Sequence, residues 1–254
     1  MYQEERHRKI LDILSQKKSI RVKDLSDELG VSLVTIRNDL TILSQKKLVD
    51  RSHGKVSVID SLNFPAHTSY NFRSKKNDTL KKQIAKKAFD LIQTNECILI
   101  DASSTAYELS KLISQSSLRL TVLTNGMMTA ELLKDVPNVT TIIIGGILRG
   151  RSNAIESTLG TEMLTKMNIN KLFISAHSFN LTDGLSDFNI YEVELKKTMV
   201  KHSEKVIALI DSSKLENTSV ATFLGTEAID TFITDNNIPE DILEKYQQYG
   251  LHII

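Results

Sequence analysis

The clearest pattern of apolar and polar positions lies between Val22 and Leu43. Leu25 and Leu29 are four residues apart, which places both side chains on one face of a helix. Gly30 follows, where helices often end at positive φ, and Ser32 is a good N-cap for a second helix. The stretch therefore predicts two short helices joined by a tight turn.

The second predicted helix has one apolar face and one polar face. Ile36, Leu40 and Leu43 are spaced to be buried together. The opposite face carries polar residues: Thr35, Arg37, Asn38 and Thr41. This arrangement is typical of a helix-turn-helix, although a helical hairpin inside an ordinary core would show the same apolar spacing.

The flanking segments favour the first alternative. Upstream, the run from Glu5 to Leu14 predicts an amphipathic helix. Downstream, residues 48–51 and 55–58 are strand-like and are separated by a tight turn at 52–54. Three helices followed by a hairpin predict a winged helix-turn-helix.

At this point the sequence resembles the N-terminal domain of the DeoR family of bacterial transcriptional regulators. The resemblance is carried by ERHRKILDIL, VKDLSDELGVSLVTIRNDLTIL and the wing LVDRSHGKV. Two positions depart from the family pattern. Arg21 stands where a Ser or Thr cap usually precedes the second helix, and Lys55 replaces the second Gly of the wing.

The resemblance implies a protein that binds double-stranded operator DNA. The second helix would lie in the major groove and the wing against the backbone or minor groove. The expected contact residues are Ser32, Thr35, Arg37, Asn38, Arg51, His53 and Lys55. Because one small domain reads few base pairs, we expect a homo-oligomer, a dimer or a tetramer.

The charge distribution agrees with one DNA-binding end. Residues 1–60 hold 12 Lys and Arg against 9 Asp and Glu, residues 61–87 hold 7 against 1, and the remainder holds 13 against 21. A basic N-terminal third suits a polyanion, although a basic face alone is often only solvated. We expect a DNA-binding domain at 1–60, a linker at 61–77 and a second domain at 78–254.

The second domain begins with a predicted helix at Asp78. Its apolar stripe is expected inward, and its lysines (Lys81, Lys82, Lys86 and Lys87) are expected on the solvated face. Strand-like and helical runs then alternate. Strands are expected at 97–100, 120–123, 140–144, 171–175, 206–210 and 231–234, with helices near 104–112, 127–134, 161–167 and 190–202. The pattern predicts an α/β fold with a mostly parallel sheet covered on both faces.

Ligands of such sheets bind beyond the carboxyl ends of the strands. Several predicted strands end in polar residues, including Asp101-Ala102-Ser103-Ser104-Thr105 and Thr124-Asn125-Gly126. Hydroxyls and free amides at a helix N-terminus favour an anion, while Asp101 could accept hydrogen bonds from sugar hydroxyls. These residues could equally be only caps and turns.

This part of the chain resembles the DeoR C-terminal sensor domain, which looks related to ribose-5-phosphate isomerase and the coenzyme A transferases. The matching stretches are ILIDASSTA, LTVLTNG, IIIGGILR, YEVELKKTM and ALIDSSK. The resemblance implies a phosphorylated sugar effector. Its expected contacts are Asp101, Ser103, Ser104, Thr105, Thr124, Asn125, Gly145, Gly146, Arg149, Lys196 and Lys214.

We expect a regulator rather than an enzyme. The family resemblance implies that it is a repressor. The alternative is an isomerase-like sensor in which Glu192, Glu194 and Lys196 supply acid–base groups, but such an alternation is more often a solvated helix face. A third possibility is a helix-turn-helix used only for protein contacts. The segment Gly145–Gly150 lacks dinucleotide-binding spacing.

Composition restricts the remaining function classes. The six His residues and the single Cys show no metal-ligand spacing, and we expect neither metal nor cofactor. The apolar runs are too short to span a bilayer, so no membrane partner is expected. One Cys allows no internal disulfide and suits the cytoplasm.

Overall fold

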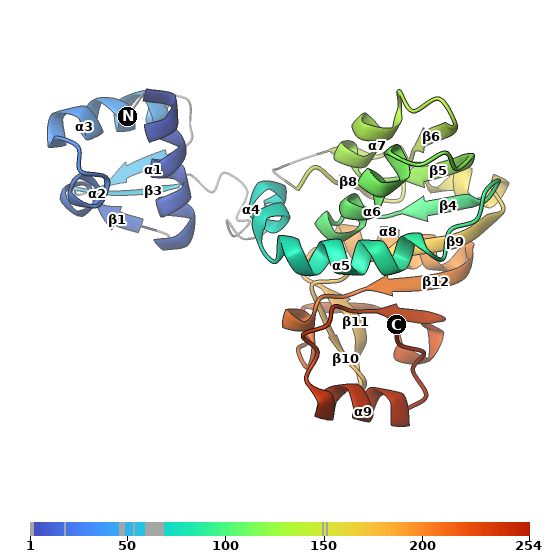
Figure 1. Ribbon diagram of the computed structural model, residues 1–254. Coiled ribbons are helices and arrows are strands. Elements are labelled where there is room, and N and C mark those ends of the chain that lie inside the picture. The colour runs from blue at the N-terminus through green and yellow to red at the C-terminus, as the bar shows by residue number, and fades with distance from the viewer. Residues whose placement is uncertain are drawn as a thin grey trace. The chain divides into compact units, whose positions relative to one another are not determined.

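The computed structural model describes residues 3–17, 19–45, 49–52, 54–58, 69–148, 150 and 152–254. The contacts divide the chain into two compact units, Met1–Phe72 and Arg73–Ile254. Figure 1 shows the elements of each unit.

The first unit is a winged helix-turn-helix, as predicted. Its elements are α1 (Gln3–Lys17), β1 (Ser19–Arg21), α2 (Val22–Leu29), α3 (Leu33–Gln45), β2 (Val49–Ser52) and β3 (Lys55–Val58). The strands form an antiparallel sheet in the order β1-β3-β2. Strand β1 was not predicted, because three residues are too few to show a period of two.

The turn between α2 and α3 has the predicted chemistry. Gly30 ends α2 at a φ of 62°, a conformation that costs glycine little. The Ser32 hydroxyl accepts a hydrogen bond from the Thr35 amide at 3.2 Å. Arg21 precedes α2 without a side-chain cap, as its departure from the family pattern suggested. One apolar core joins all of these elements and consists of Ile10, Leu14, Ile20, Leu25, Ile36, Leu40, Leu43, Val49 and Val56.

The second unit is built on a six-stranded sheet in which all neighbouring strands are parallel. In spatial order the strands are β14 (Thr231–Ile233), β12 (Ser203–Leu209), β9 (Ile169–Ile174), β4 (Cys97–Ile100), β5 (Leu120–Thr124) and β6 (Val139–Ile143). All six predicted strands are present. The order places β4 and β9, which are far apart in sequence, side by side at the centre.

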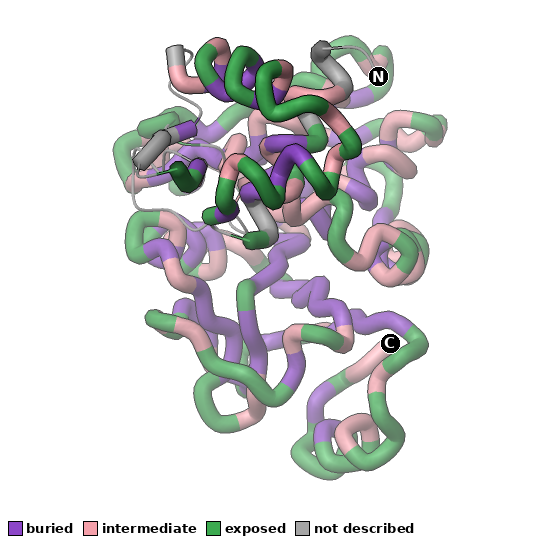
Figure 2. The backbone as a smooth tube through the Cα atoms, turned by 90° about the vertical axis from the view of Figure 1, so that its left-hand side faces the viewer, coloured by how far each residue is buried: buried purple, intermediate pink, exposed green. Residues whose placement is uncertain are grey.

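Helices cover both faces of this sheet, which explains why its strands are nearly continuous apolar runs. One face packs against α5 (Asp78–Phe89), α6 (Ser104–Ser114) and α7 (Met127–Leu133). The other packs against α8 (Ile190–Lys201) and α9 (Glu240–Gln248). Figure 2 shows the burial of the chain along its length.

Several elements at and beyond the division between the units were not predicted. Helix α4 (Tyr70–Lys75) occupies the end of the predicted linker, so residues 70–75 are helical rather than irregular. A small antiparallel sheet has the order β10-β11-β13. Its strands and the remaining short elements are β10 (Ser178–Asn180), β11 (Gly184–Asp187), β13 (Ala221–Leu224), β7 (Ile147–Leu148), β8 (Ile155–Glu156) and the 3-10 helices η2 (Thr161–Lys166), η3 (Ser212–Lys214) and η4 (Thr226–Ala228). The segment expected as a helix near 161–167 is thus a 3-10 helix.

Candidate DNA interface and effector site

The polar face of α3 is open to solvent, as a recognition helix requires. Arg37 and Asn38 are exposed, and Thr35 is half-buried. The same face carries Val34, which is 66% exposed. Val34 was not among the predicted contacts, yet an exposed aliphatic group beside polar donors can contact a thymine methyl in the major groove.

A buried carboxylate fixes α3 against α1. Asp39 accepts hydrogen bonds from the Arg6 guanidinium, including one at 3.0 Å, and lies 3.0 Å from the His7 ring. Burial alone would raise the pKa of Asp39, but the bonds to Arg6 and His7 outweigh it and hold that pKa below its ordinary value. Asp39 therefore orients the helix that carries Arg37 and Asn38.

The predicted wing contacts are only partly described. Lys55 is exposed at the start of β3, where it can meet a phosphate. The backbone of Arg51 lies in β2, while its side chain and all of His53 lie outside the described residues.

In the sensor unit, Asp101 follows β4 and joins the ends of two neighbouring strands. One carboxylate oxygen accepts a hydrogen bond from the Ser103 amide and the other from the Ser175 amide, both at 3.1 Å. Asp101 is 1% exposed. The carboxylate thus holds the loops after β4 and β9, which differs from the open acceptor for sugar hydroxyls that we expected.

Lys196 of α8 is a second buried charge at this edge. It is 6% exposed, and its Nζ donates to the carbonyl of Ser175 at 2.8 Å and to Asp187 at 2.7 Å, and lies 3.6 Å from Asp101. Burial alone would lower the pKa of Lys196, but Asp187 and Asp101 outweigh it and raise that pKa. The expectation of a solvated Glu–Lys helix face is therefore wrong for Lys196.

Lys214 lies beyond β12 and meets the same central loop. Its Nζ donates to the hydroxyl of Ser175 at 3.0 Å and to the carbonyl of Ala176 at 2.8 Å, and lies 3.6 Å from Asp211. Burial lowers the pKa of Lys214 despite the nearby Asp211. Asp211 in turn accepts a hydrogen bond from Asn77 at 3.0 Å.

The expectation that Lys81 of α5 lies on a solvated face is wrong. Lys81 is 3% exposed rather than solvated, and it donates to the backbone carbonyls of Arg73 and Lys76. Burial, followed by the charge of Lys214, lowers the pKa of Lys81 to about 8. An ammonium has three donors, and among the described residues only these two carbonyls accept from it. Lys82 of the same helix is exposed, as expected.

The first turn of α6 combines free donors with an unpartnered hydroxyl. Ser103 caps the helix by accepting a hydrogen bond from the Ala106 amide at 3.1 Å. Amides of the first turn, such as those of Ser104 and Thr105, have no partner within a helix. Thr105 is 0% exposed, and its Oγ1 has no hydrogen-bond partner among the described residues. This turn can therefore receive an anion.

The loop after β5 lies next to this turn. A Cβ on Gly126 would be 3.1 Å from the Cα of Ala102, so the loops after β4 and β5 approach closely. Thr124 accepts a hydrogen bond from the Gly126 amide at 2.9 Å, and Asn125 donates to the carbonyl of Ile155 at 3.0 Å. The Oδ1 of Asn125 is buried without a partner among the described residues.

Gly145 and Gly146 follow β6 and allow close backbone approach. A Cβ on Gly146 would lie 2.4 Å from the carbonyl oxygen of Glu156, and one on Gly160 would lie 2.2 Å from that of Gly145. The glycines thus permit packing between two loops at the sheet edge. Arg149 lies outside the described residues.

Glu192 of α8 faces the same charge cluster. Burial, with a smaller effect from Asp187, raises the pKa of Glu192 to about 7. Apart from Arg149, the structure therefore gathers the predicted effector residues at the carboxyl edge of the sheet. It adds four charged groups that the prediction did not include among the effector contacts: Lys81, Asp187, Glu192 and Asp211.

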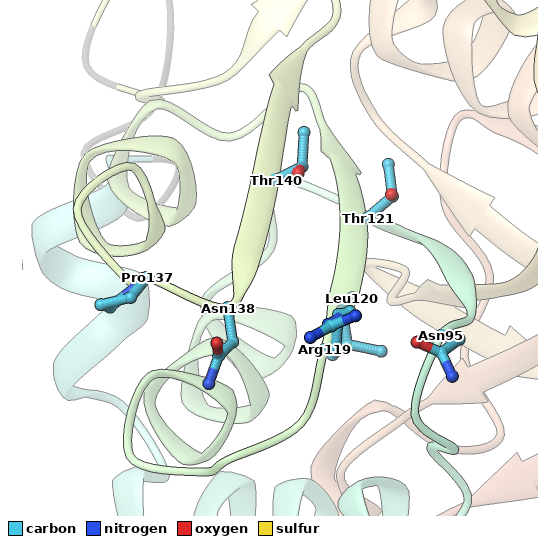
Figure 3. Close-up of a pocket in the computed structure, with 7 residues that line it drawn as sticks. All are labelled: Asn95, Arg119, Leu120, Thr121, Pro137, Asn138 and Thr140. Carbon is cyan, nitrogen blue, oxygen red and sulfur yellow. The ribbon is translucent and has the colours of Figure 1, made fainter.

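A separate pocket lies at the opposite ends of β5 and β6 (Figure 3). It is lined by Asn95, Arg119, Leu120, Thr121, Pro137, Asn138 and Thr140. Within the described parts of the chain, no group of three His, Cys, Asp or Glu residues could hold a metal ion. No helix among the described residues is long and apolar enough to cross a membrane.

Comparison with known proteins settles the family. A sequence model of the DeoR-like helix-turn-helix domain matches residues 6–62, and one of the DeoR C terminal sensor domain matches residues 76–236. The chain belongs to the DeoR family. Both resemblances given by the sequence are therefore confirmed.

Named DeoR-family relatives match over nearly their whole length. The HTH-type transcriptional regulator GolR of Listeria innocua is 40% identical over 100% of this chain and 98% of its own. The L-fucose operon activator of Haemophilus influenzae is 30% identical over 95% of this chain and 96% of its own. The lactose phosphotransferase system repressor of Lactococcus lactis is 28% identical over 98% of this chain and 97% of its own.

Among solved structures, ribose 5-phosphate isomerase A of Methanocaldococcus jannaschii aligns with a TM-score of 0.41 at 18% identity, covering 55% of each chain. The relatives that match nearly the whole chain are transcriptional regulators. The DeoR-family chain is accordingly a DNA-binding regulator, and this interpretation is favoured over the isomerase-like alternative.

Proposed function

We propose that this DeoR-family chain represses an operon for sugar metabolism and leaves its operator when a phosphorylated sugar binds the sensor unit. The proposal rests on the arrangement of polar groups in the sensor unit. At the carboxyl edge of the parallel sheet, the first turn of α6 presents the unpartnered hydroxyl of Thr105, while the buried ammonium of Lys81 and the half-buried ammonium of Lys214 lie close enough for Lys214 to lower the pKa of Lys81.

This arrangement suits a phosphate better than a neutral sugar. Two nearby cations repel each other, and a dianion between them would relieve that repulsion and satisfy the free amides of α6. Glu192 and the Oδ1 of Asn125 would then receive sugar hydroxyls. Arg149 would complete the contacts.

The operator would be read by α3, through Thr35, Arg37, Asn38 and the methyl groups of Val34, with Ser32 at the helix start. Arg51, His53 and Lys55 of the wing would meet the backbone or minor groove. Two copies of the chain, or four, would bind a palindromic site in the cytoplasm. The relatives include both a repressor and an activator, and repression is the mode we propose.

Fluorescence anisotropy on the DNA upstream of the chain's own gene tests the proposal. The full chain should bind that DNA more tightly than random DNA. A panel of ribose 5-phosphate, galactose 6-phosphate, fructose 1-phosphate and glycerol 3-phosphate should include a compound that releases it, whereas the unphosphorylated sugars should not. Binding that ignores all four phosphates, or steady turnover of one of them, would overturn the proposal.

A further inference from the structure

Helix α4 occupies a special place on the covalent path between the two units. It is the first described element after the wing, since β3 ends at Val58 and α4 begins at Tyr70. Any change that the sensor transmits along the chain must therefore pass through α4. How its end is held then matters for regulation.

The C-terminal end of α4 is held by Lys81. The last carbonyls of a helix have no partner within it, and here those of Arg73 and, just beyond α4, Lys76 accept hydrogen bonds from the buried ammonium of Lys81. A positive charge at a helix C-terminus is favourable. Lys81 thus replaces solvent at the end of this helix.

Two further contacts tie the same region to the sensor. The guanidinium of Arg73 donates to the carbonyl of Ser152 at 3.1 Å. Asn77, which links α4 to α5 at a φ of 56°, donates to Asp211 at 3.0 Å and to Ser213 at 2.9 Å. Lys81, which holds the end of α4, is therefore also one of the two cations of the expected anion site, and Asp211, which accepts from Asn77, lies 3.6 Å from the other cation, Lys214.

We propose that Lys81 is the positioning residue that couples the anion site to α4. An anion in the site takes the third donor of Lys81 and draws the ammonium toward itself, which changes its hydrogen bonds to the two carbonyls at the end of α4. The changed hydrogen bonding at the end of α4 then alters the position of this helix, from which the chain connects back to the wing. This inference rests on the proposed function and adds its route of regulation.

The test compares Lys81→Met with the wild type in the full chain. Methionine keeps the length and apolar body of the side chain and removes the charge and all three donors. The probe is the member of the four-phosphate panel that releases the wild type from its DNA. Its affinity for each protein is measured first by calorimetry, so that release can be compared at saturation.

The operator affinity of each protein without phosphate is measured as the reference for its own release. At saturating phosphate the wild type should lose roughly 5- to 150-fold in DNA affinity, the usual range of allosteric coupling, while Lys81→Met should lose less than about twofold. A residue that only attracts the anion would behave differently. Its loss would raise the phosphate concentration required, and release at saturation would remain complete.

Lys87→Met is the matched control. Lys87 lies on the same helix and also donates to a backbone carbonyl, that of Thr234 at 2.9 Å, far in sequence from α4. It should respond to phosphate as the wild type does. Full release of Lys81→Met at saturation, or loss of release in Lys87→Met as well, would overturn the inference while leaving the proposed function intact. If no phosphate of the panel releases the wild type, both fail.

Hydrogen exchange on the wild type gives a second readout if Lys81→Met does not fold. Addition of the releasing phosphate should change the protection of amides between residues 70 and 81. A change confined to the loops after β4 and β5, with none at 70–81, would overturn the inference.

Discussion

The two candidate sites of this protein are built in opposite ways. On α3, the polar groups that would meet DNA are exposed, apart from the half-buried Thr35, and they lie within one short segment, Ser32–Thr41. At the sheet edge, the polar groups that would meet the effector are mostly buried, and they come from segments between Arg73 and Lys214. One site is a local surface, whereas the other depends on the whole sensor fold.

This difference has energetic consequences. Exposed donors on α3 are solvated before DNA arrives, so removing one should affect binding and hardly affect folding. Lys196 and Asp101 are both buried, so each charge interacts with the other instead of with water. Removal of one partner leaves the other charge buried without compensation. Substitutions at the two sites should therefore separate binding from stability.

The largest expected effect is on folding. Lys196→Met should lower the free energy of unfolding of the sensor unit by about 3–5 kcal/mol, because Asp187 and Asp101 would lose their shared cation. Urea unfolding followed by circular dichroism measures this. The adjacent Lys197, which pairs with Glu194 in solvent, is the control, and Lys197→Met should change stability by less than about 1 kcal/mol. Equal effects would show that Lys196 is not held as a buried ion pair.

The next effect is on DNA recognition. Arg37→Ala or Asn38→Ala should cost roughly 1–3 kcal/mol on operator DNA and much less on random DNA, if these side chains read bases. Lys55→Ala should weaken both equally and make the salt dependence shallower, because it removes a phosphate contact. Anisotropy titrations over a range of salt test both. An equal loss on the two DNAs for Arg37→Ala and Asn38→Ala would refute base readout by α3.

A smaller effect is expected at the anion site. Thr105→Val should leave stability unchanged or slightly higher, since it removes a buried hydroxyl with no partner among the described residues. It should weaken phosphate binding by about 0.5–1.5 kcal/mol, as calorimetry would show. Thr141 also has such a hydroxyl, but on β6, so Thr141→Val should leave phosphate affinity unaltered. If Thr105→Val bound phosphate with wild-type affinity, the anion would not bind at the first turn of α6.

The smallest effect concerns pH. The pKa of Lys81 is lowered to about 8 by burial and by Lys214, against smaller opposing effects from Asp211 and Glu108. The ammonium is lost as pH rises through this value, so phosphate affinity should fall by roughly fourfold between pH 7 and 8.5 if only the charged form binds. Glu192, whose pKa is raised to about 7, contributes in the same direction. Titrations across this range should show a weaker dependence in Lys81→Met, and an identical dependence would contradict the role of Lys81.

Much of the fold followed from local patterns. The α2–α3 turn, the six parallel strands and most of the helices that cover them are visible because apolar periodicity and caps act over a few residues. The small sheet β10-β11-β13 and helix α4 escaped prediction, since their elements are too short to show a period. For Lys81 a signal was present. It lies three residues before Ile84 and seven before Ala88, on the buried stripe of α5, yet its charge made solvent exposure the natural expectation.

The sequence by itself determined the family, the two kinds of domain and the exposed face of α3, because neighbouring residues on a helix face the same side whatever surrounds them. Only the tertiary structure decided which charges meet at the sheet edge. Asp101 turned out to bind two backbone amides, and Lys81 to hold the end of α4. Such partners are set by strand order and by the cost of burying a charge, which no short stretch of sequence contains.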